Sequence, residues 1–185
     1  PGAANQYRKL AAKQSDPLAK NGVIGAFCRT YDIYEAIDTF LAGIYAPVET
    51  MPGRYTYLGG STTGGAVVYD NGLFLYSHHA TDPCSGRLVN AFDLVRLHKF
   101  GEQDYAVDVQ TPPNRLPSYQ AMCELAVNDT RVSKQLAKER AESVIGDFGG
   151  LVDADHEGDN FDWTTELEIN KQTLQIGRAS CRERV

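Results

Sequence analysis

The sequence predicts an α+β fold, a small antiparallel three-stranded sheet packed with helices. Apolar and aromatic residues recur at a spacing of two in three short runs, R-Y-T-Y from Arg54, A-V-V-Y-D from Ala66 and L-F-L-Y-S from Leu73. That spacing is typical of half-buried strands. Asn71-Gly72 between the second and third runs favours a tight hairpin turn. Segments with caps and helical spacing flank the runs, so we expect helices to cover the sheet.

One helix is predicted from Ala91 to about Phe100, directly after the last strand. The side chain of Asn90 can accept hydrogen bonds from the free amides at its start. Asp93 adds a negative charge where the helix dipole favours one, and Gly101 can close the other end. Together with the strands, this helix defines a module over residues 21–101.

A second helix is predicted from Asp32, whose side chain can cap it, with Glu35 completing a capping box. An apolar stripe follows at helical spacing, and Pro47 ends the segment. We expect this helix to be the first ordered element. Residues 1–20 are polar and rich in small side chains, so they are interpreted as a disordered tether.

The rest of the chain divides by composition. Residues 102–117 form a Pro-rich connection, and residues 118–146 a helical segment in which Ser118 and Asp129 can cap two helices. Residues 147–175 are interpreted as an acidic mobile linker, because eight acidic residues and no Lys or Arg lie between Asp147 and Glu168. Residues 176–185 look like a translated sequencing adaptor and are interpreted as an artefactual tail.

Composition fits a globular protein with one core. Hydrophobic residues make up 42% of the 185 and charged residues 23%, with a formal charge of -6. No apolar run approaches the roughly 18 residues of a membrane span, so no membrane partner is expected. Cys28, Cys84 and Cys123 are widely spaced, which is typical of reduced cytoplasmic thiols.

Several blocks resemble the linker region of phage and prophage replication proteins of the virulence-associated E family. They are G-V-I-G-A-F-C-R-T-Y from Gly22, R-Y-T-Y-L-G-G-S-T-T-G-G from Arg54, Y-S-H-H-A-T-D-P from Tyr76, N-A-F-D-L-V-R-L-H from Asn90 and P-S-Y-Q-A-M from Pro117. The resemblance implies a piece of a larger primase-helicase in a bacterial host cytoplasm, with a primase domain before it and a P-loop helicase domain after it. ATP and Mg are then cofactors of the parent protein.

The strand pair and the helix at Asn90 also resemble the zinc ribbon of bacterial replicative primases. Gly59 and Ser61 stand where a first ligand pair is expected, and Ser77 stands where the second pair would open. These residues are not the Cys and His ligands of a structural zinc site. The module is therefore interpreted as a degenerate zinc ribbon, and no metal or other cofactor is expected in this fragment.

Cations and aromatic residues mix around the predicted sheet, which favours contact with single-stranded DNA through stacking and phosphate pairing. Residues 1–100 carry nine basic and eight acidic side chains, so binding would be modest and salt-sensitive. His98 belongs to the same basic and aromatic set. The candidate nucleic-acid-binding residues are Arg54, Tyr55, Tyr57, His78, His79, Arg87, Arg96 and Lys99.

An alternative metal set comprises His78, His79, Asp82 and Cys84. Adjacent strand residues point to opposite faces, so the two imidazoles are poorly placed to chelate one ion. The interpretation without metal is that one histidine is buried, the other caps the loop, and Asp82 bonds its own backbone ahead of Pro83.

The expected function is that of a non-catalytic fragment, with no catalytic residue assigned. It would position single-stranded template or couple the flanking primase and helicase domains. The chain contains no Gly-Lys-Ser/Thr, so nucleotide hydrolysis is not expected within it. Two alternatives stay open, a metal-dependent enzyme using His78, His79 and Asp82, and a pure interdomain adaptor without affinity for DNA.

Overall fold

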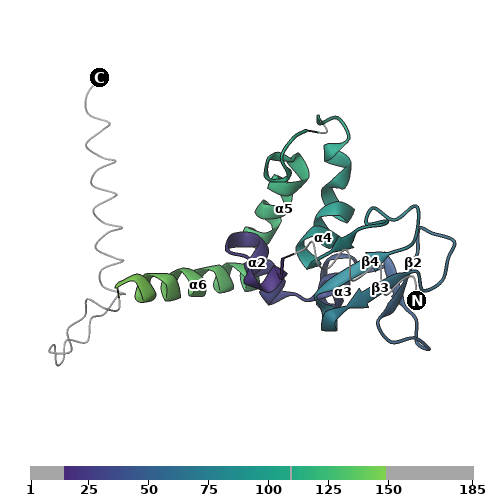
Figure 1. Cartoon of the computed structure of the whole chain (residues 1–185), viewed down its shortest axis with the longest axis horizontal. Helices are drawn as coiled ribbons and strands as arrows, with labels where there is room; N and C mark the ends of the chain where they lie inside the picture. The colour runs from purple at the N-terminus through teal and green to yellow at the C-terminus, as the bar shows by residue number, and fades with distance from the viewer. Residues whose placement is uncertain (1–14, 109, 149–185) are drawn as a thin grey trace, which may run out of the picture. The chain divides into compact units, whose positions relative to one another are not determined.

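The computed structural model describes residues 15–108 and 110–148, in which helices pack beside an antiparallel sheet (Figure 1). The helices are α2 (Gly22–Thr30), α3 (Ile33–Phe40), α4 (Ala91–Phe100), α5 (Pro117–Asn128) and α6 (Thr130–Phe148). Short 3₁₀ turns are η1 (Pro17–Ala19), η2 (Asp70–Gly72), η3 (Gly101–Asp104) and η4 (Pro113–Arg115). The α+β class predicted from the sequence is confirmed.

The sheet has five strands rather than the three predicted. It comprises β1 (Tyr45–Pro47), β2 (Arg54–Tyr57), β3 (Ala66–Tyr69), β4 (Phe74–Ser77) and β5 (Leu88–Val89), in that order and antiparallel throughout. The three predicted strands form its centre. The added edge strands are three and two residues long, too short to show an alternating pattern.

The turn between β3 and β4 is longer than the predicted Asn71-Gly72 pair. The last ladder pair is Tyr69 with Phe74, so four residues make the connection. Asp70 and Asn71 both have left-handed backbones, with φ of 49° and 53°, and Gly72 follows at 96°. Asp, Asn and Gly are the residues that tolerate this conformation, which is why the sequence can turn here.

Three predicted helix caps are present and a fourth is not. The Asp129 side chain accepts from the amides of Arg131 and Val132 at 2.9 and 3.0 Å at the start of α6. The Asp32 side chain accepts from the amide of Glu35 at 2.8 Å, and Asn90 accepts from the amide of Asp93 at 2.9 Å. The prediction that Ser118 caps α5 is wrong, because the helix begins one residue earlier, after Leu116. Ser118 lies inside the helix, where its hydroxyl joins a different polar network.

The predicted first ordered element was also wrong, since η1 and α2 precede the helix at Asp32. Helix α2 has no side-chain cap, and its sequence contains two glycines. Its stability comes from tertiary packing, because Ala26, Phe27 and Cys28 are buried in the core. The tether proposed for residues 1–20 therefore overlaps folded structure after residue 14, and residues 1–14 lie outside the described part.

Aromatic rings hold the helices together. Phe27 of α2 meets Phe92 of α4 edge-on, with centroids 5.9 Å apart and planes at 85°. Phe27 also contacts Tyr31 at 5.2 Å, and Phe92 contacts Tyr119 of α5 at 5.8 Å. Such tilted pairs are favourable beyond the area they bury. Helices α2, α4 and α5 consequently lie side by side, and α4 also contacts β4 and β5 (Figure 1).

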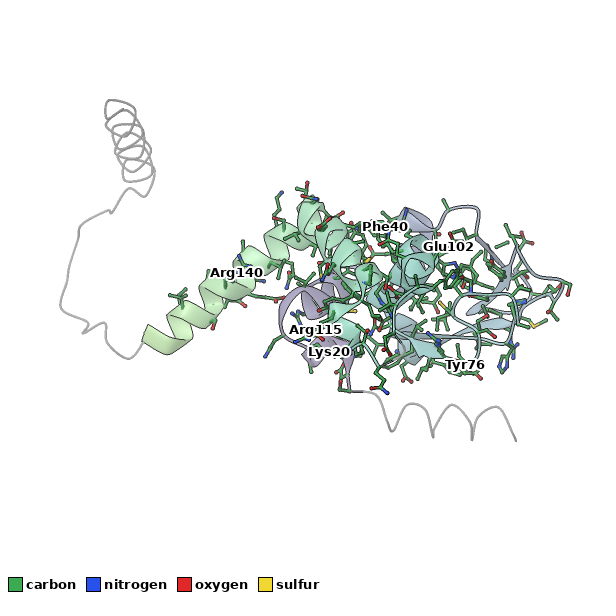
Figure 2. All side chains as sticks on the ribbon, turned by 90° about the horizontal axis from the view of Figure 1, so that it is seen from above. Lys20, Phe40, Tyr76, Glu102, Arg115 and Arg140 are labelled. Atoms are coloured by element: carbon green, nitrogen blue, oxygen red, sulfur yellow. The ribbon has the colours of Figure 1, made fainter. Side chains whose placement is uncertain are left out.

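The first turns of α6 join the same core. Val132 and Leu136 are buried there, and Arg29 of α2 forms a two-pronged ion pair with Glu139, with both N to O distances 2.6 Å. From this junction α6 runs away from the sheet, with Arg140 exposed on it (Figure 2). This compact unit ends at Ser143, and a second unit begins at Val144.

The second unit contains the last turn of α6 in the described part of the chain. The acidic linker proposed for residues 147–175 lies almost entirely outside the described residues, as does the tail at 176–185. Within 15–108 and 110–148, no helix combines the length and apolarity needed to cross a lipid bilayer.

Candidate functional site

A tight loop after β4 positions the acidic and thiol candidates. The backbone amide of Asp82 donates to the carbonyl of His79 at 3.1 Å, and the amide of Gly86 donates to the carbonyl of Ser77 at 2.9 Å. Within this loop the Asp82 carboxylate accepts from the amide of Cys84 at 2.8 Å. That bond, which spans Pro83, is the local side-chain to backbone contact expected from the sequence. This hydrogen bond helps to hold the Asp82 carboxylate in the interior, where its side chain is 0% exposed.

Asp82 meets one residue from the sheet and one from a helix. The Tyr45 hydroxyl of β1 donates to Asp82 Oδ2 at 2.7 Å and lies 2.8 Å from Nε2 of His98 in α4. His98 Nε2 is itself 3.3 Å from Asp82 Oδ1. The side chain of Asp82 is 0% exposed and that of His98 is 3% exposed. We call Tyr45, Asp82 and His98 the polar centre.

The polar centre favours an ionised Asp82. Burial is the largest single influence and raises the pKa of Asp82, but hydrogen bonds from His98, Ser77, Tyr45 and the Cys84 amide together hold this pKa below its usual value. Burial also raises the pKa of the Tyr45 hydroxyl, and nearby Cys84 and Asp82 raise it further. The carboxylate therefore acts as the acceptor around which the other groups are organised.

Cys84 completes a set of metal-ligating atoms. One donor atom from each of Asp82, Cys84 and His98 lies within 4.8 Å of the other two, and this is the sole group of three such residues in the described part of the chain. Burial raises the pKa of the Cys84 thiol well above its ordinary value, and the charge of Asp82 adds to the effect. Without a cation the thiol is therefore protonated.

His79 lies in a separate cradle made by the loop between β2 and β3. Its ring is 2% exposed, and its Nε2 accepts from the amide of Tyr57 at 3.3 Å. A Cβ placed on Gly65 would be 2.7 Å from Nε2, and one on Gly60 would be 3.2 Å from Nδ1. Only glycine leaves room for the ring. Within the described residues Nδ1 has no hydrogen-bond partner.

The structure does not bring His78 and His79 together. His78 is exposed, and its ring packs against Tyr76 with centroids 4.7 Å apart. His79 instead points into the glycine cradle. The alternative metal set of His78, His79, Asp82 and Cys84 is thus split, because only Asp82 and Cys84 converge, and they do so with His98. Alternation along the strand end accounts for the separation.

Two of the eight predicted nucleic-acid residues are buried, and two more are partly buried and held by neighbouring side chains. Tyr55 is 9% exposed and belongs to the core, and Tyr57 packs against Tyr45 and His98. The Tyr55 ring is therefore not free to stack on a base. His79 is enclosed as described above.

Arg96 is also engaged in a structural role. Its guanidinium contacts Asp93 at 2.9 Å, the Ser118 hydroxyl at 2.7 Å and Asp104 at 3.6 Å. This network ties α4 to η3 and α5. It explains why Ser118 is buried inside α5 rather than used as a cap.

The exposed candidates are Arg54, His78, Arg87 and Lys99. Arg54 donates to the carbonyl of Gly64 at 3.1 Å and so steadies its own loop. Arg87 instead lines a surface cavity of about 290 Å³ together with His98, Glu102 and Tyr105. Tyr105 is 85% exposed.

Sequence reasoning missed Tyr45 and Tyr105, and gave His98 a surface role. For His98 a signal was present, because Leu94 and Val95 stand four and three residues before it and are buried. That spacing places His98 on the inner face of α4. No comparable local signal marks Tyr45, whose partners lie 37 and 53 residues away.

No protein-family model, no curated protein and no solved structure matches this chain.

Proposed function

We propose that this chain is a non-catalytic module of a phage-type replication primase-helicase, where it couples the flanking domains and positions the single-stranded template. The observation that carries the proposal is that the sequence blocks resembling the virulence-associated E family meet in one folded unit. They supply α2, β2 with its following loop, the end of β4 with its following loop, α4 and the start of α5.

The ionisable residues of these blocks support a structural role. Asp82 and His98 bond to each other and to Tyr45, and Arg96 is held by Asp93, Asp104 and Ser118. A catalytic group needs access to a substrate, whereas the Asp82 side chain is 0% exposed and Arg96 is held by three partners. This favours a scaffold whose chemistry is carried out by neighbouring domains.

The proposed contact with DNA is centred on Arg87 and Tyr105, which line the same cavity. An exposed tyrosine offers a stacking platform for an unpaired base, and a nearby guanidinium can pair with a phosphate. Glu102 in the same lining opposes phosphate binding. The affinity is therefore modest and falls steeply with salt.

Fluorescence anisotropy of a labelled oligothymidylate at two salt concentrations tests the contact. Arg87→Ala should weaken binding at low salt and reduce the slope of log K against log salt by about 0.7, the value for one phosphate contact on a single strand. Tyr105→Ala should cost about 1–3 kcal/mol of binding free energy through lost stacking. Arg140→Ala removes an equal charge from an exposed position on α6. It should change neither the binding free energy nor the salt slope.

Absence of binding by the wild-type protein at low salt would overturn the DNA contact and leave the pure interdomain adaptor. Equal losses from Arg87→Ala and Arg140→Ala would show that only general charge matters, and would remove the proposed site.

The parent assignment is tested separately by the flanking open reading frame. A Walker motif downstream and an Asp-x-Asp primase motif upstream are expected, and with them the use of ATP and Mg in a bacterial host cytoplasm. Their absence would contradict the proposed parent.

A further inference from the structure

We propose that Asp82, Cys84 and His98 form a binding site for one zinc-class divalent cation. The proposal goes beyond the replication role and does not depend on it. It rests on the convergence of a carboxylate, a thiol and an imidazole whose donor atoms lie within 4.8 Å of one another in the interior.

The spacing of the donors suits a small cation. Zinc bonds to oxygen, nitrogen and sulfur of about 2.0–2.3 Å place tetrahedral ligand atoms about 3.5 Å apart. His98 Nε2 and Asp82 Oδ1 are already 3.3 Å apart. Cys84 is held near them, because its amide is bonded to the Asp82 carboxylate. A small closing movement of side chains would complete the geometry.

A hydrogen bond already orients the carboxylate. The Tyr45 hydroxyl donates to Asp82 Oδ2 at 2.7 Å, and its second contact, with His98 Nε2 at 2.8 Å, would give way to the cation. In metal sites, such neighbouring groups fix the direction of the ligands and strengthen binding. On binding, the Cys84 thiol would release its proton to solvent, and the His98 ring would bind through the Nε2 lone pair with its proton on Nδ1. Tyr45 would keep its bond to Asp82.

The donor types select the class of metal. A thiolate and an imidazole favour zinc and related transition ions, whereas Mg²⁺ and Ca²⁺ require several oxygen ligands. His98 also lines the cavity of about 290 Å³ at the surface. This cavity offers an entry path and room for water as a fourth ligand.

This site differs from the one that a zinc ribbon would use. The ribbon positions at Gly59, Ser61 and Ser77 carry no soft donors. The proposed ligands come instead from the loop after β4 and from the inner face of α4. The centre without metal is a satisfied hydrogen-bonded core, so binding has to be measured directly.

Titration of the reduced protein with Co²⁺ provides that measurement, in a Cys181→Ser background that removes the tail thiol. A thiolate-to-cobalt charge-transfer band should grow to one equivalent and disappear when zinc is added. Cys84→Ser should lose the band, whereas Cys123→Ala and His78→Ala should retain it. No band in the wild-type protein, or a band that survives Cys84→Ser, would overturn the proposal.

A second measurement covers the case in which Cys84→Ser does not fold. Zinc should raise the Tm of the wild-type protein, and Mg²⁺ at the same concentration should leave it unchanged. Tyr45→Phe keeps all three ligands, so it should retain the cobalt band while weakening binding about tenfold. A wild-type Tm that does not respond to zinc would reject the site.

Discussion

Between α2 and α4 the core consists of aromatic rings, whereas between α4 and the loops at the end of the sheet it consists of hydrogen-bonded polar side chains. Phe27 and Phe92 represent the first region, and Asp82 and His98 the second. The stability that apolar contacts contribute varies gradually with side-chain shape, because the hydrophobic effect is not directional. The stability of the polar region depends on every hydrogen-bond partner being present, because a buried group that loses its hydrogen bond bears the full cost of desolvation. The two regions should therefore respond differently to mutation.

The largest effect is expected from truncation in the aromatic region. Phe92→Ala removes a fully buried ring that contacts both Phe27 and Tyr119. The free energy of unfolding should fall by about 3–5 kcal/mol. Phe92→Leu should cost clearly less, because much of the volume is retained. Urea denaturation measures both variants, and equal losses would contradict the graded behaviour expected of this region.

Asp82→Asn should produce the next largest effect, although it changes almost no volume. The variant removes the charged acceptor shared by Tyr45, His98 and the Cys84 amide, so we expect a loss of about 1–3 kcal/mol in unfolding free energy. Urea denaturation in the presence of a chelator measures the effect without metal. Asp38→Asn, on the exposed side of α3, is the matched control. If both variants had the same stability, the polar centre would contribute nothing special.

Gly65→Ala tests the cradle around His79. The new methyl would lie 2.7 Å from the ring, so the loop or the ring must move, at a cost of about 1–3 kcal/mol. Gly101→Ala meets nothing within 4 Å and should stay within about 0.5 kcal/mol of the wild type. A double-mutant cycle with His79→Ala should show strong coupling to Gly65→Ala. Additive effects would place the strain elsewhere.

The smallest effect concerns the surface ion pair between α2 and α6. Its hydrogen bond from Arg29 lowers the pKa of Glu139, so the pair stabilises the fold fully above the unfolded-state pKa of the carboxyl. That contribution is lost as the pH falls through the lower folded-state pKa. Arg29→Lys should remove about 0.5 kcal/mol at neutral pH and much less in acid, measured by thermal unfolding at several pH values.

Glu142→Gln is the control for this comparison, because Lys138 and Glu142 form a looser exposed pair at 3.9 Å. A pH dependence that is identical in the wild type and Arg29→Lys would show that the two-pronged geometry is not what stabilises the junction.

Locally determined features could be predicted from the sequence, and features that depend on distant partners could not. The three central strands follow from alternation within four residues, and the caps at Asp32 and Asn90 involve an amide three residues away. Strands β1 and β5 exist because Tyr45 pairs with Tyr57 and Leu75 with Val89. Segments of two or three residues carry too little pattern to reveal such pairing.

The same distinction holds for the candidate site. Asp82 and Cys84 were identified as candidates because they stand two residues apart in a polar loop. His98 was assigned to a surface, although its position after Leu94 and Val95 indicates an inner face. Tyr45 has no local signal, since only the folded sheet brings it to Asp82. The sequence therefore indicates that this loop carries metal-ligating residue types, but only the tertiary structure shows which residues meet in the site.

The order of strands in the sheet has a consequence for how the chain folds. Every pair of hydrogen-bonded neighbours is also consecutive along the chain, so the sheet can form by successive closure of short loops. Helix α2, in contrast, is fastened through Arg29 to a residue 110 positions later. During synthesis on the ribosome the sheet can thus assemble early, while α2 has to wait for α6 to emerge before its packing is complete.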